Sequence, residues 1–320
     1  MSDTSTWFIL AAAVAAMLVF DLAFFGRRSQ SREITFRVAL FWSIAWSAIG
    51  VAFVGVVWSL RGGNAAEEYL AGFVIEKSLS IDNLFVFALI FSYFAVPLWL
   101  QRRVIFWGIV GAILLRGIFI LAGAALLDAF HWMIYVFGGF LVLTAIRMAR
   151  HSDIEIHPEQ NPVLRALRKT TPMTTDYYGD RFFVRVDGQR MITPLVAAFV
   201  LVATFDVVFA VDSIPAIFAV TEDTFVVYAA NAMSLLGLTA LYFLLAGMLQ
   251  RFQYLSLGLA VVLGFVGVKM LISDVYKIPI PISLAVIVTV LTVAILWSLR
   301  SSRGMSEEDP PVTVPRPGTP

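Results

Sequence analysis

The sequence contains no cysteine, only three histidines and few charged residues. Without cysteine the chain has no disulfide, no thiolate metal site and no lipoprotein anchor. Charged residues make up 14% of the 320 residues, hydrophobic residues make up 60%, and the mean hydropathy is +0.86. A soluble domain is nearer half apolar and a quarter charged. The composition therefore excludes an ordinary soluble domain and predicts an integral membrane protein that contacts a lipid bilayer.

Apolar runs of about 20 residues, the length at which a helix crosses a bilayer, recur along the whole chain. The N-terminal sequence MSDTSTWF lacks the basic segment and cleavage site of a signal peptide, so we expect the first run to be retained. We expect an all-α fold with nine spans, since helices satisfy their own backbone groups in lipid. The predicted spans are Trp7–Phe25, Val38–Leu60, Tyr69–Phe94, Val104–Leu127, Trp132–Met148, Ile192–Val220, Phe225–Leu249, Leu255–Ser273 and Ile280–Leu299.

Basic residues concentrate on one side of these spans. The segments after spans 1, 3, 5, 7 and 9 hold 18 of the 23 Lys and Arg, whereas the opposite loops hold only Arg61 and Lys277. Because cytoplasmic loops carry the excess of basic residues, the pattern predicts an external N-terminus and a cytoplasmic C-terminus. The other three, Lys77, Arg116 and Lys269, fall within spans.

The chain divides into a membrane domain, residues 1–303, and a proline-rich tail, residues 304–320. The tail has few apolar residues, and we expect it to be disordered. A charged, proline-bearing loop at 149–190 is predicted to be cytoplasmic, and it separates two halves of the membrane domain, at about 69–148 and 191–273.

The two halves carry matching charged motifs. EKSLSIDN in the third span has Glu76 and Asp82 six residues apart, and DVVFAVDS in the sixth has Asp206 and Asp212 six apart. The two spans run in opposite directions across the bilayer. Opposed copies of one motif are typical of a 3+3 inverted repeat, in which the substrate site forms near the membrane midplane.

Helix geometry limits which of these acids can bind one ion. Six residues turn a helix by about 600°, so the two acids of a motif point about 120° apart and lie about 9 Å apart along the axis. We therefore predict a metal site formed by Asp82 and Asn83 of one motif with Asp212 and Ser213 of the other.

The neighbouring residues extend this prediction. Pro215 frees the backbone carbonyl of Val211, which is a further oxygen ligand beside the second motif. Glu76 is expected on the outer side of the site and Asp206 on the cytoplasmic side, as gates, proton acceptors or additional metal ligands. Lys77, Arg116 and Lys269 are expected to support the site by neutralising acids.

The predicted ligands select the ion. Carboxylates, an amide and a hydroxyl are hard oxygen donors, which suit Mn²⁺, Mg²⁺ or Ca²⁺, and no histidine falls in the middle of a span. The sequence shows no nucleotide-binding loop, nucleophile triad or HExxH zinc motif. We expect no enzyme activity, no cofactor and no nucleic-acid partner.

At these motifs the chain resembles the TerC family of bacterial membrane proteins, named for tellurium resistance, and its Alx-like branch of manganese exporters. The resemblance covers nearly all spans and is most specific in IEKSLSIDNLFVFALIFSYFAVP, LLRGIF, FDVVFAVDSIPAIFAVT, LYFLLAGM and GVKMLISDVYKIP. It implies manganese efflux, with Asp82, Asn83 and the Asp212 region at the metal site, and it suggests a link to the LysE-like transporter group. It also implies roles in metal homeostasis, tellurite resistance and pH response.

Two positions depart from the family pattern. The family usually has a glutamate where this chain has Ala203 and an arginine where it has Thr239. Alignment of LTALYF with LLRGIF places Thr239 within one residue of the position of Arg116. We hypothesise that relatives have a salt bridge here, and that losing both partners avoids a single buried charge.

These observations predict a bacterial inner-membrane exporter of Mn²⁺, in exchange for protons. Two alternatives stay open at this point: a membrane scaffold that supports metal loading or stress resistance without transport, and an exchanger of Ca²⁺ or another cation. A scaffold would need the loop Ser152–Arg190, whereas a minimal carrier would not.

Overall fold

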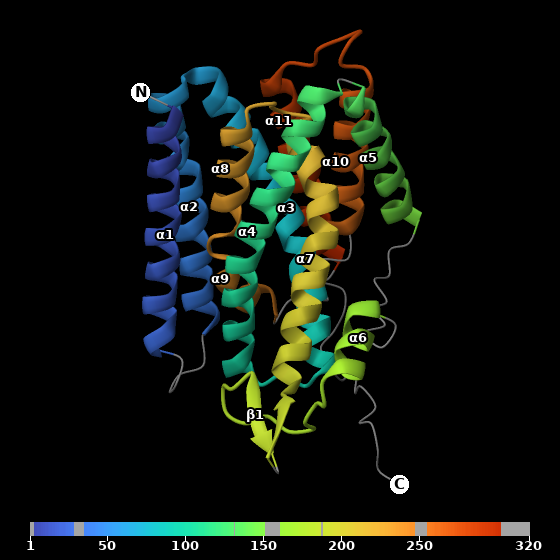
Figure 1. Cartoon of the computed structure of the whole chain (residues 1–320). Helices are drawn as coiled ribbons and strands as arrows, with labels where there is room; N and C mark the ends of the chain where they lie inside the picture. The colour runs from blue at the N-terminus through green and yellow to red at the C-terminus, as the bar shows by residue number, and fades with distance from the viewer. Residues whose placement is uncertain are drawn as a thin grey trace.

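The computed structural model describes residues 3–28, 35–130, 132–150, 161–186, 188–246 and 255–301. The predicted disordered tail, 304–320, and the segment 151–160 of the predicted cytoplasmic loop lie outside the described residues. The described part is mostly helical (Figure 1). Its helices are α1 (Asp3–Arg28), α2 (Phe36–Arg61), α3 (Gly63–Tyr93), α4 (Leu98–Ala129), α5 (Met133–Arg150), α6 (Pro162–Thr170), α7 (Pro194–Phe218), α8 (Thr224–Leu235), α9 (Leu238–Ala246), α10 (Leu255–Leu271) and α11 (Ile280–Ser301).

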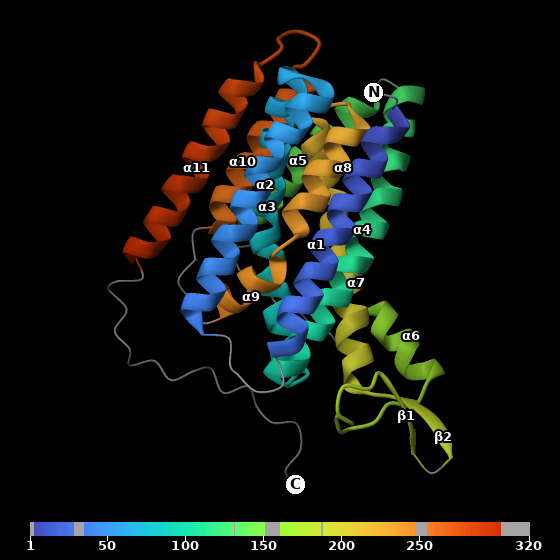
Figure 2. The ribbon, with the colours of Figure 1, turned by 90° about the vertical axis from the view of Figure 1, so that its left-hand side faces the viewer.

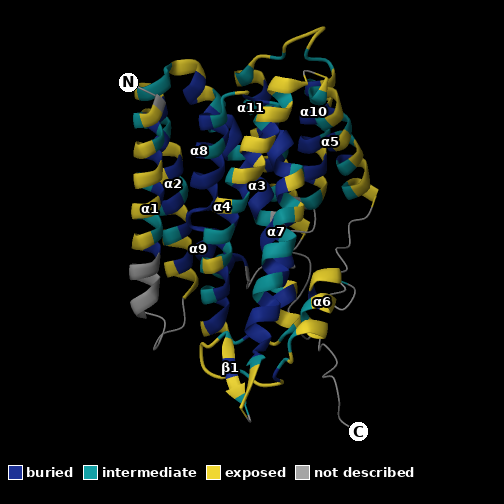
Figure 3. Cartoon of the chain, in the orientation of Figure 1, coloured by how far each residue is buried: buried dark blue, intermediate teal, exposed yellow. Residues whose placement is uncertain are grey.

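The long helices form a bundle with α3 at its centre (Figures 1 and 2). Helix α3 packs against α2, α7 and α8, α4 packs against α7 and α8, and α5 packs most extensively against α10. Half of the apolar window of α7 is buried, against 17% for α5 and 22% for α1. Burial is thus high on the helix that carries the second charged motif, and the outer helices expose apolar side chains, as expected beside lipid (Figure 3).

Among the described residues, six helices are long and apolar enough to cross a membrane, and a bent pair, α8 with α9, makes a seventh. The six are α1, α2, α4, α5, α7 and α11. Helix α10 is shorter, with 17 residues, and α3 contains the charged motif. The structure therefore supports a multi-pass helical membrane protein, and the count of nine spans stays a prediction.

One small sheet corrects the all-α prediction. Strand β1 (Phe183–Val186) pairs antiparallel with β2 (Gln189–Ile192) within the predicted cytoplasmic loop. Gly188, at φ 80°, lies in the turn between them, and a two-residue turn ending in glycine matches the twist of a hairpin. The hairpin and α6 lie at the opposite end of the bundle from the first residues of α1 (Figures 1 and 2).

The predicted seventh span is broken in its middle. Helix α8 ends at Leu235 and α9 begins at Leu238, and the two helices meet at an angle of 45°. Gly237 adopts φ +77°, and a Cβ there would overlap the Cβ of Trp46 on α2. Glycine is needed at this position both for its conformation and for the space.

Helices α5 and α10 touch through glycine. A Cβ on Gly138 would lie 3.0 Å from the carbonyl oxygen of Gly267, and a Cβ on Gly267 would lie 2.9 Å from the carbonyl oxygen of Gly138. The two backbones therefore cross at close range, as is common where small residues line a helix contact in membranes.

Candidate ion-binding site

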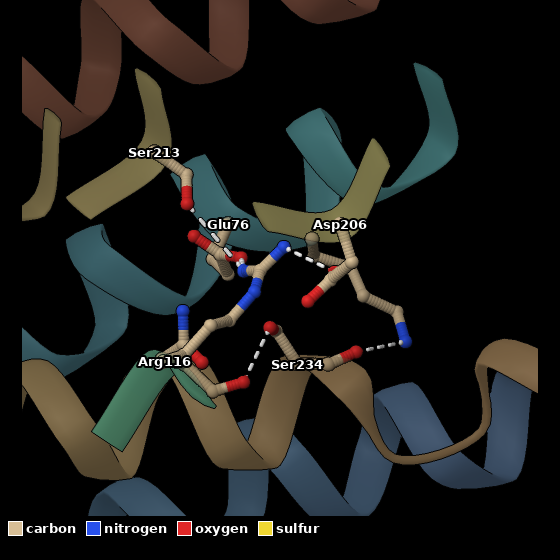
Figure 4. A network of polar contacts seen from close by, with 7 residues as sticks. Glu76, Arg116, Asp206, Ser213 and Ser234 are labelled. Carbon is tan, nitrogen blue, oxygen red and sulfur yellow. Dashed lines mark hydrogen bonds and ion pairs between the residues drawn. The ribbon is translucent and has the colours of Figure 1, made fainter. Parts of the chain in front are cut away.

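Arg116 lies at the centre of a buried cluster of charges. It projects from α4 towards α3 and α7, and its side chain is completely buried. Its Nη1 donates a hydrogen bond to Oε1 of Glu76 on α3, and its Nη2 donates to Oδ1 of Asp206 on α7 at 3.1 Å. Nη1 also lies 3.4 Å from the hydroxyl oxygen of Ser213. Figure 4 shows the guanidinium between the two carboxylates, so three helices meet at one cation.

Glu76 and Asp206 are the first acids of the two matching motifs. Because α3 and α7 pack side by side, the structure brings these two positions onto a single guanidinium, from residues 130 apart in the chain. The motif spacing had predicted them on opposite sides of a metal site, with Arg116 only as support. The observed arrangement makes the first acids of the motifs a pair that shares one cation, Arg116.

The charge pairing in this cluster is incomplete. Within the described part of the chain, Oε2 of Glu76, Oδ2 of Asp206 and Nε of Arg116 are buried and have no hydrogen-bond partner. Two carboxylates against one guanidinium leave one excess negative charge when both acids are ionised. Buried charges are normally paired and fully hydrogen-bonded, so the two free carboxylate oxygens mark a site with unused capacity to bind a cation.

Lys77 binds the broken helix beside this cluster. Its Nζ donates to the backbone carbonyls of Ser234, at 3.0 Å, and Leu236, at 3.2 Å. These carbonyls lack the helical partners they would have if α8 continued unbroken into α9, and a lysine ammonium is well suited to satisfy them. Lys77 thus binds the backbone at the break, and its role as a supporting charge for the acids stays a prediction.

Asp212 and Ser213 are adjacent on α7 and face different neighbours. Ser213 is buried and approaches Arg116, whereas Asp212 is half-buried and accepts a hydrogen bond from Thr144 on α5 at 3.2 Å. Successive residues on a helix point about 100° apart, which accounts for the separation. Asp212 is therefore directed to α5 rather than to the guanidinium.

The other predicted residues are less completely placed. Asn83 on α3 is buried, and the side chain of Asp82 lies outside the described residues. Along α3, Asp82 follows Glu76 by about 9 Å of helix, and along the antiparallel α7, Asp212 follows Asp206 by about 9 Å in the opposite direction. Among the described side chains no group of three His, Asp or Glu is suited to hold a metal. The predicted pairing of Asp82 with Asp212 thus stays a prediction.

Lys269, the third predicted supporting charge, lies apart from Arg116. It is half-buried in the last turn of α10, where it interacts electrostatically with Glu68 at the start of α3. Glu68 also accepts a hydrogen bond from Thr221 at 2.5 Å. Lys269 therefore lies within electrostatic reach of Glu68.

Sequence reasoning missed two polar residues near the site, Asn231 and Ser234, and named Thr239 only as a departure from the family pattern. Asn231 and Ser234 lie on α8, and the hydroxyl of Ser234 donates to the carbonyl of Asn231 at 2.8 Å (Figure 4). Thr239 on α9 is 1% exposed, and neither its hydroxyl nor Nδ2 of Asn231 has a partner among the described residues. The signal that could have found them is their polarity within a long apolar span.

The long apolar helices, the buried ion cluster and the broken span define a polytopic integral membrane protein. The family model described as "Integral membrane protein TerC family" matches residues 62–305. The chain belongs to the TerC family of integral membrane proteins.

Two relatives match over almost their whole length. The chain is 44% identical over 303 residues to an "Uncharacterized membrane protein STKORF319" of Myxococcus xanthus, covering 95% of this chain and 94% of the relative. It is 44% identical over 298 residues to the "Putative membrane-bound redox modulator Alx" of Escherichia coli (strain K12), covering 91% and 92%. No solved structure matches the chain.

Proposed function

We propose that the protein is a bacterial inner-membrane transporter that exports a hard divalent cation, Mn²⁺ above all, from the cytoplasm, with protons as the exchanged ion. The observation that carries the proposal is the buried acid pair, Glu76 and Asp206, shared between α3 and α7 and only partly neutralised by Arg116. Ionisable groups within a membrane are costly, and they mark ion pathways.

The packing of the helices supports an inverted repeat. In an inverted repeat α3 corresponds to α7, α4 to α8–α9, and α5 to α10. The contact of α3 with α8 then corresponds to the contact of α7 with α4, and both contacts are extensive. The same exchange maps the contact of α5 with α10 onto itself, in agreement with the reciprocal approach of Gly138 and Gly267. Two opposed halves around a central ion site are the usual architecture for alternating access.

The ligand chemistry supports the choice of ion. Every candidate ligand in and near the cluster is an oxygen, from carboxylates, hydroxyls, an amide or backbone carbonyls, and the chain has no thiol. Oxygen ligands favour Mn²⁺, Mg²⁺ or Ca²⁺ over copper and zinc. The name "redox modulator" applies to the Alx relatives. In this chain any redox role would act through a group other than cysteine, and metal export is one such route.

The proposal includes an orientation. The hairpin end of the bundle is placed in the cytoplasm, because the segments there carry the excess of basic residues. The N-terminus is then external. Asp82 and Asn83 would lie nearer the cytoplasm than Glu76, and Asp212 nearer the outside than Asp206, which gives a line of acids along the proposed path.

Uptake of Mn²⁺ into inside-out vesicles tests the proposal directly, with Mg²⁺ and Ca²⁺ compared at the same concentration. We expect saturable Mn²⁺ uptake that requires the protein and that is lost in Asp82→Asn, Asp206→Asn and Asp212→Asn, since an amide keeps the volume but removes the charge that offsets cation desolvation. Asp180→Asn is the matched control, because Asp180 is an exposed acid that pairs with Arg103 outside the site. Equal uptake by vesicles with and without the protein would overturn the assignment.

A scaffold without transport is the second candidate, and the folded segment with α6, β1 and β2 favours it. That segment is anchored to the bundle: the hydroxyl of Tyr177 donates to the carbonyl of Phe94 at 2.8 Å, and Arg103 pairs with Asp180. Replacing the hairpin residues 183–192 with a short glycine-serine linker would abolish function in a scaffold, whereas Mn²⁺ uptake would persist in a transporter.

A further inference from the structure

The guanidinium of Arg116 occupies the place in which a cation bound by both acids would lie. Glu76 and Asp206 each contribute one oxygen to it, from two helices that belong to opposite halves of the chain. The cluster is closed to solvent, because Glu76 and Arg116 are 0% exposed and Asp206 is 5% exposed. No other cation among the described side chains is hydrogen-bonded to either acid, since Lys77 is engaged with the carbonyls of Ser234 and Leu236.

The unused oxygens show that the acids are not saturated by Arg116. Oε2 of Glu76 and Oδ2 of Asp206 are both buried without a partner in the described structure. An arginine that served only to satisfy two carboxylates would be expected to use its five donors on their four oxygens. Nε is unpartnered within the same described residues and Nη1 makes a long contact with Ser213, so several donors and acceptors of the cluster are left over.

Charge balance decides whether a divalent cation and the guanidinium can share the acid pair. Two carboxylates and a divalent cation sum to zero, whereas the guanidinium adds one buried positive charge to that group, and the ammonium of Lys77 beside the cluster adds another. Burying an uncompensated charge is strongly unfavourable. The metal and the guanidinium are therefore alternatives for the same pair of acids.

We propose that Arg116 is a tethered counter-cation that holds Glu76 and Asp206 when no metal is bound, and that the divalent ion displaces it from these acids. The inference rests on the proposed function, in that the acid pair belongs to the ion path. It adds that Arg116 sets the affinity of the acid pair for the divalent ion, because it lowers the fraction of acid pairs that are free to bind metal. After transport, Arg116 returns to the acids and displaces the ion. A purely structural Arg116 would hold the helices together in every state and would not compete.

Binding of Mn²⁺ to the purified full-length protein, measured by the decrease of the free Mn²⁺ signal in electron paramagnetic resonance, tests the competition. We expect Arg116→Gln to bind Mn²⁺ at least about 10-fold more tightly than the wild type, because the apparent affinity is reduced by the fraction of sites that the tethered cation leaves open. Arg116→Lys is expected to fall between the two, since an ammonium binds one acid at a time. The control is Arg103→Gln, which removes an exposed arginine and should leave Mn²⁺ affinity unchanged.

Thermal denaturation in detergent gives a second measurement. The midpoint of Arg116→Gln is expected to be lower than that of the wild type without metal and to rise more steeply with Mn²⁺ concentration, because metal replaces the missing cation. In the double variant Arg116→Gln with Glu76→Gln, the extra affinity should disappear. Equal or weaker Mn²⁺ binding by Arg116→Gln, or by Arg116→Lys if the glutamine variant does not fold, would overturn the inference.

The combined outcomes separate this inference from the proposed function. Mn²⁺ uptake by wild-type vesicles without tighter binding in the arginine variants would leave export standing and refute the competition. Tighter binding in the variants with no uptake by the wild type would support the competition and refute export. Neither binding nor uptake in any form of the protein would refute both.

Discussion

Helix α4 and the pair α8–α9 occupy equivalent places in the two halves of the predicted repeat, yet they differ in two ways. Helix α4 is continuous over 32 residues and carries Arg116, whereas the second half is broken around Gly237 and carries Thr239 within one residue of the corresponding position. In one half a charged side chain reaches the acid pair. In the other, a bend frees backbone carbonyls, and a lysine from α3 binds them.

The comparison extends to the two central helices. Lys77 follows Glu76 directly, but Val207 follows Asp206 at the equivalent position of α7. The bend in α8–α9 frees carbonyls, and Lys77 of α3 binds them. Helix α4 is continuous and frees no such carbonyls, so α7 needs no lysine at the position of Val207. The two halves therefore share a pattern of packing but divide the polar roles between them.

The largest effect is expected from removing the cation of the unbroken half. Arg116→Met should destabilise the metal-free protein by about 3–5 kcal/mol, because it leaves two buried carboxylates without a partner. Denaturation midpoints and membrane yield measure the loss. Arg103→Met is the control, since its exposed pair with Asp180 is worth about 0–1 kcal/mol. A loss no larger than that of the control would contradict the view that Arg116 stabilises the protein by pairing with Glu76 and Asp206.

Adding a cation to α9, at Thr239, tests the same comparison in the half of the chain that lacks a counterpart of Arg116. Thr239 is 1% exposed, so Thr239→Arg should lower the membrane yield strongly, since an unpartnered buried charge costs about 3–5 kcal/mol. If Ala203 and Thr239 replace an ion pair, addition of Ala203→Glu should restore much of the yield and Mn²⁺ efflux. Additive damage in the double variant would show that the two positions are not partners.

The break itself should be sensitive to a single methyl group. Gly237→Ala places a Cβ against Trp46 and forces a left-handed conformation on an L-residue. We expect a loss of about 2–4 kcal/mol in unfolding free energy, from backbone strain together with overpacking. Gly55→Ala is a matched control on α2, where a Cβ meets nothing within 4 Å. Similar denaturation midpoints for the two variants would show that the break is readily remodelled.

A smaller loss is expected from the lysine at the break. Lys77→Met keeps much of the apolar stem but leaves the carbonyls of Ser234 and Leu236 without their donor, at a cost of about 1–3 kcal/mol. Lys77→Arg should retain most of the stability, because it keeps a positive donor. Equal loss in both variants, measured as denaturation midpoints, would argue that the size of the side chain matters rather than its hydrogen bonds.

The smallest effect concerns the hydroxyl of Thr239. It is buried and unpartnered among the described residues, so Thr239→Val should change stability by less than about 1 kcal/mol, with a gain more consistent with the structure than a loss. Denaturation midpoints measured beside Thr239→Ser provide the check, because serine keeps the hydroxyl and loses the methyl. A large loss in the valine variant would mean that the hydroxyl has a function that its lack of a partner does not reveal.

The apolar runs and the repeated motif were sufficient to predict a helical membrane protein and its key polar residues, because both are local features of the sequence. The partners of Arg116 were not predictable in this way, since Glu76 and Asp206 lie 40 and 90 residues from it. Antiparallel packing of α3 and α7 decides which acids of the motifs meet, and that packing depends on the whole bundle. The sequence favoured the second acid of each motif as metal ligands. The structure joins the first acids through Arg116, and the pairing of the second acids stays a prediction, because the side chain of Asp82 lies outside the described residues.

Two local signals were present and were not used. The segment RFFVRVDGQRMI has two short runs on either side of Asp-Gly, the first rich in Phe and Val, which is typical of a hairpin, and the hairpin β1–β2 is found there. Gly237 stands within an apolar run in which a continuous helix was predicted. Glycine is tolerated in many membrane helices, so the break depends on Trp46 and Lys77, which come from distant parts of the chain.

The crossing of α5 and α10 has a mechanical consequence. At Gly138 and Gly267 the backbones of the two helices lie so close that a Cβ added to either glycine would meet the carbonyl oxygen of the other. Points near such a crossing move little when the helices rotate against each other, whereas points further along the same helices sweep through larger arcs. If the two predicted halves rock against each other, this crossing is the expected fulcrum, and a bulkier residue there would change the angle between α5 and α10 without touching any charge.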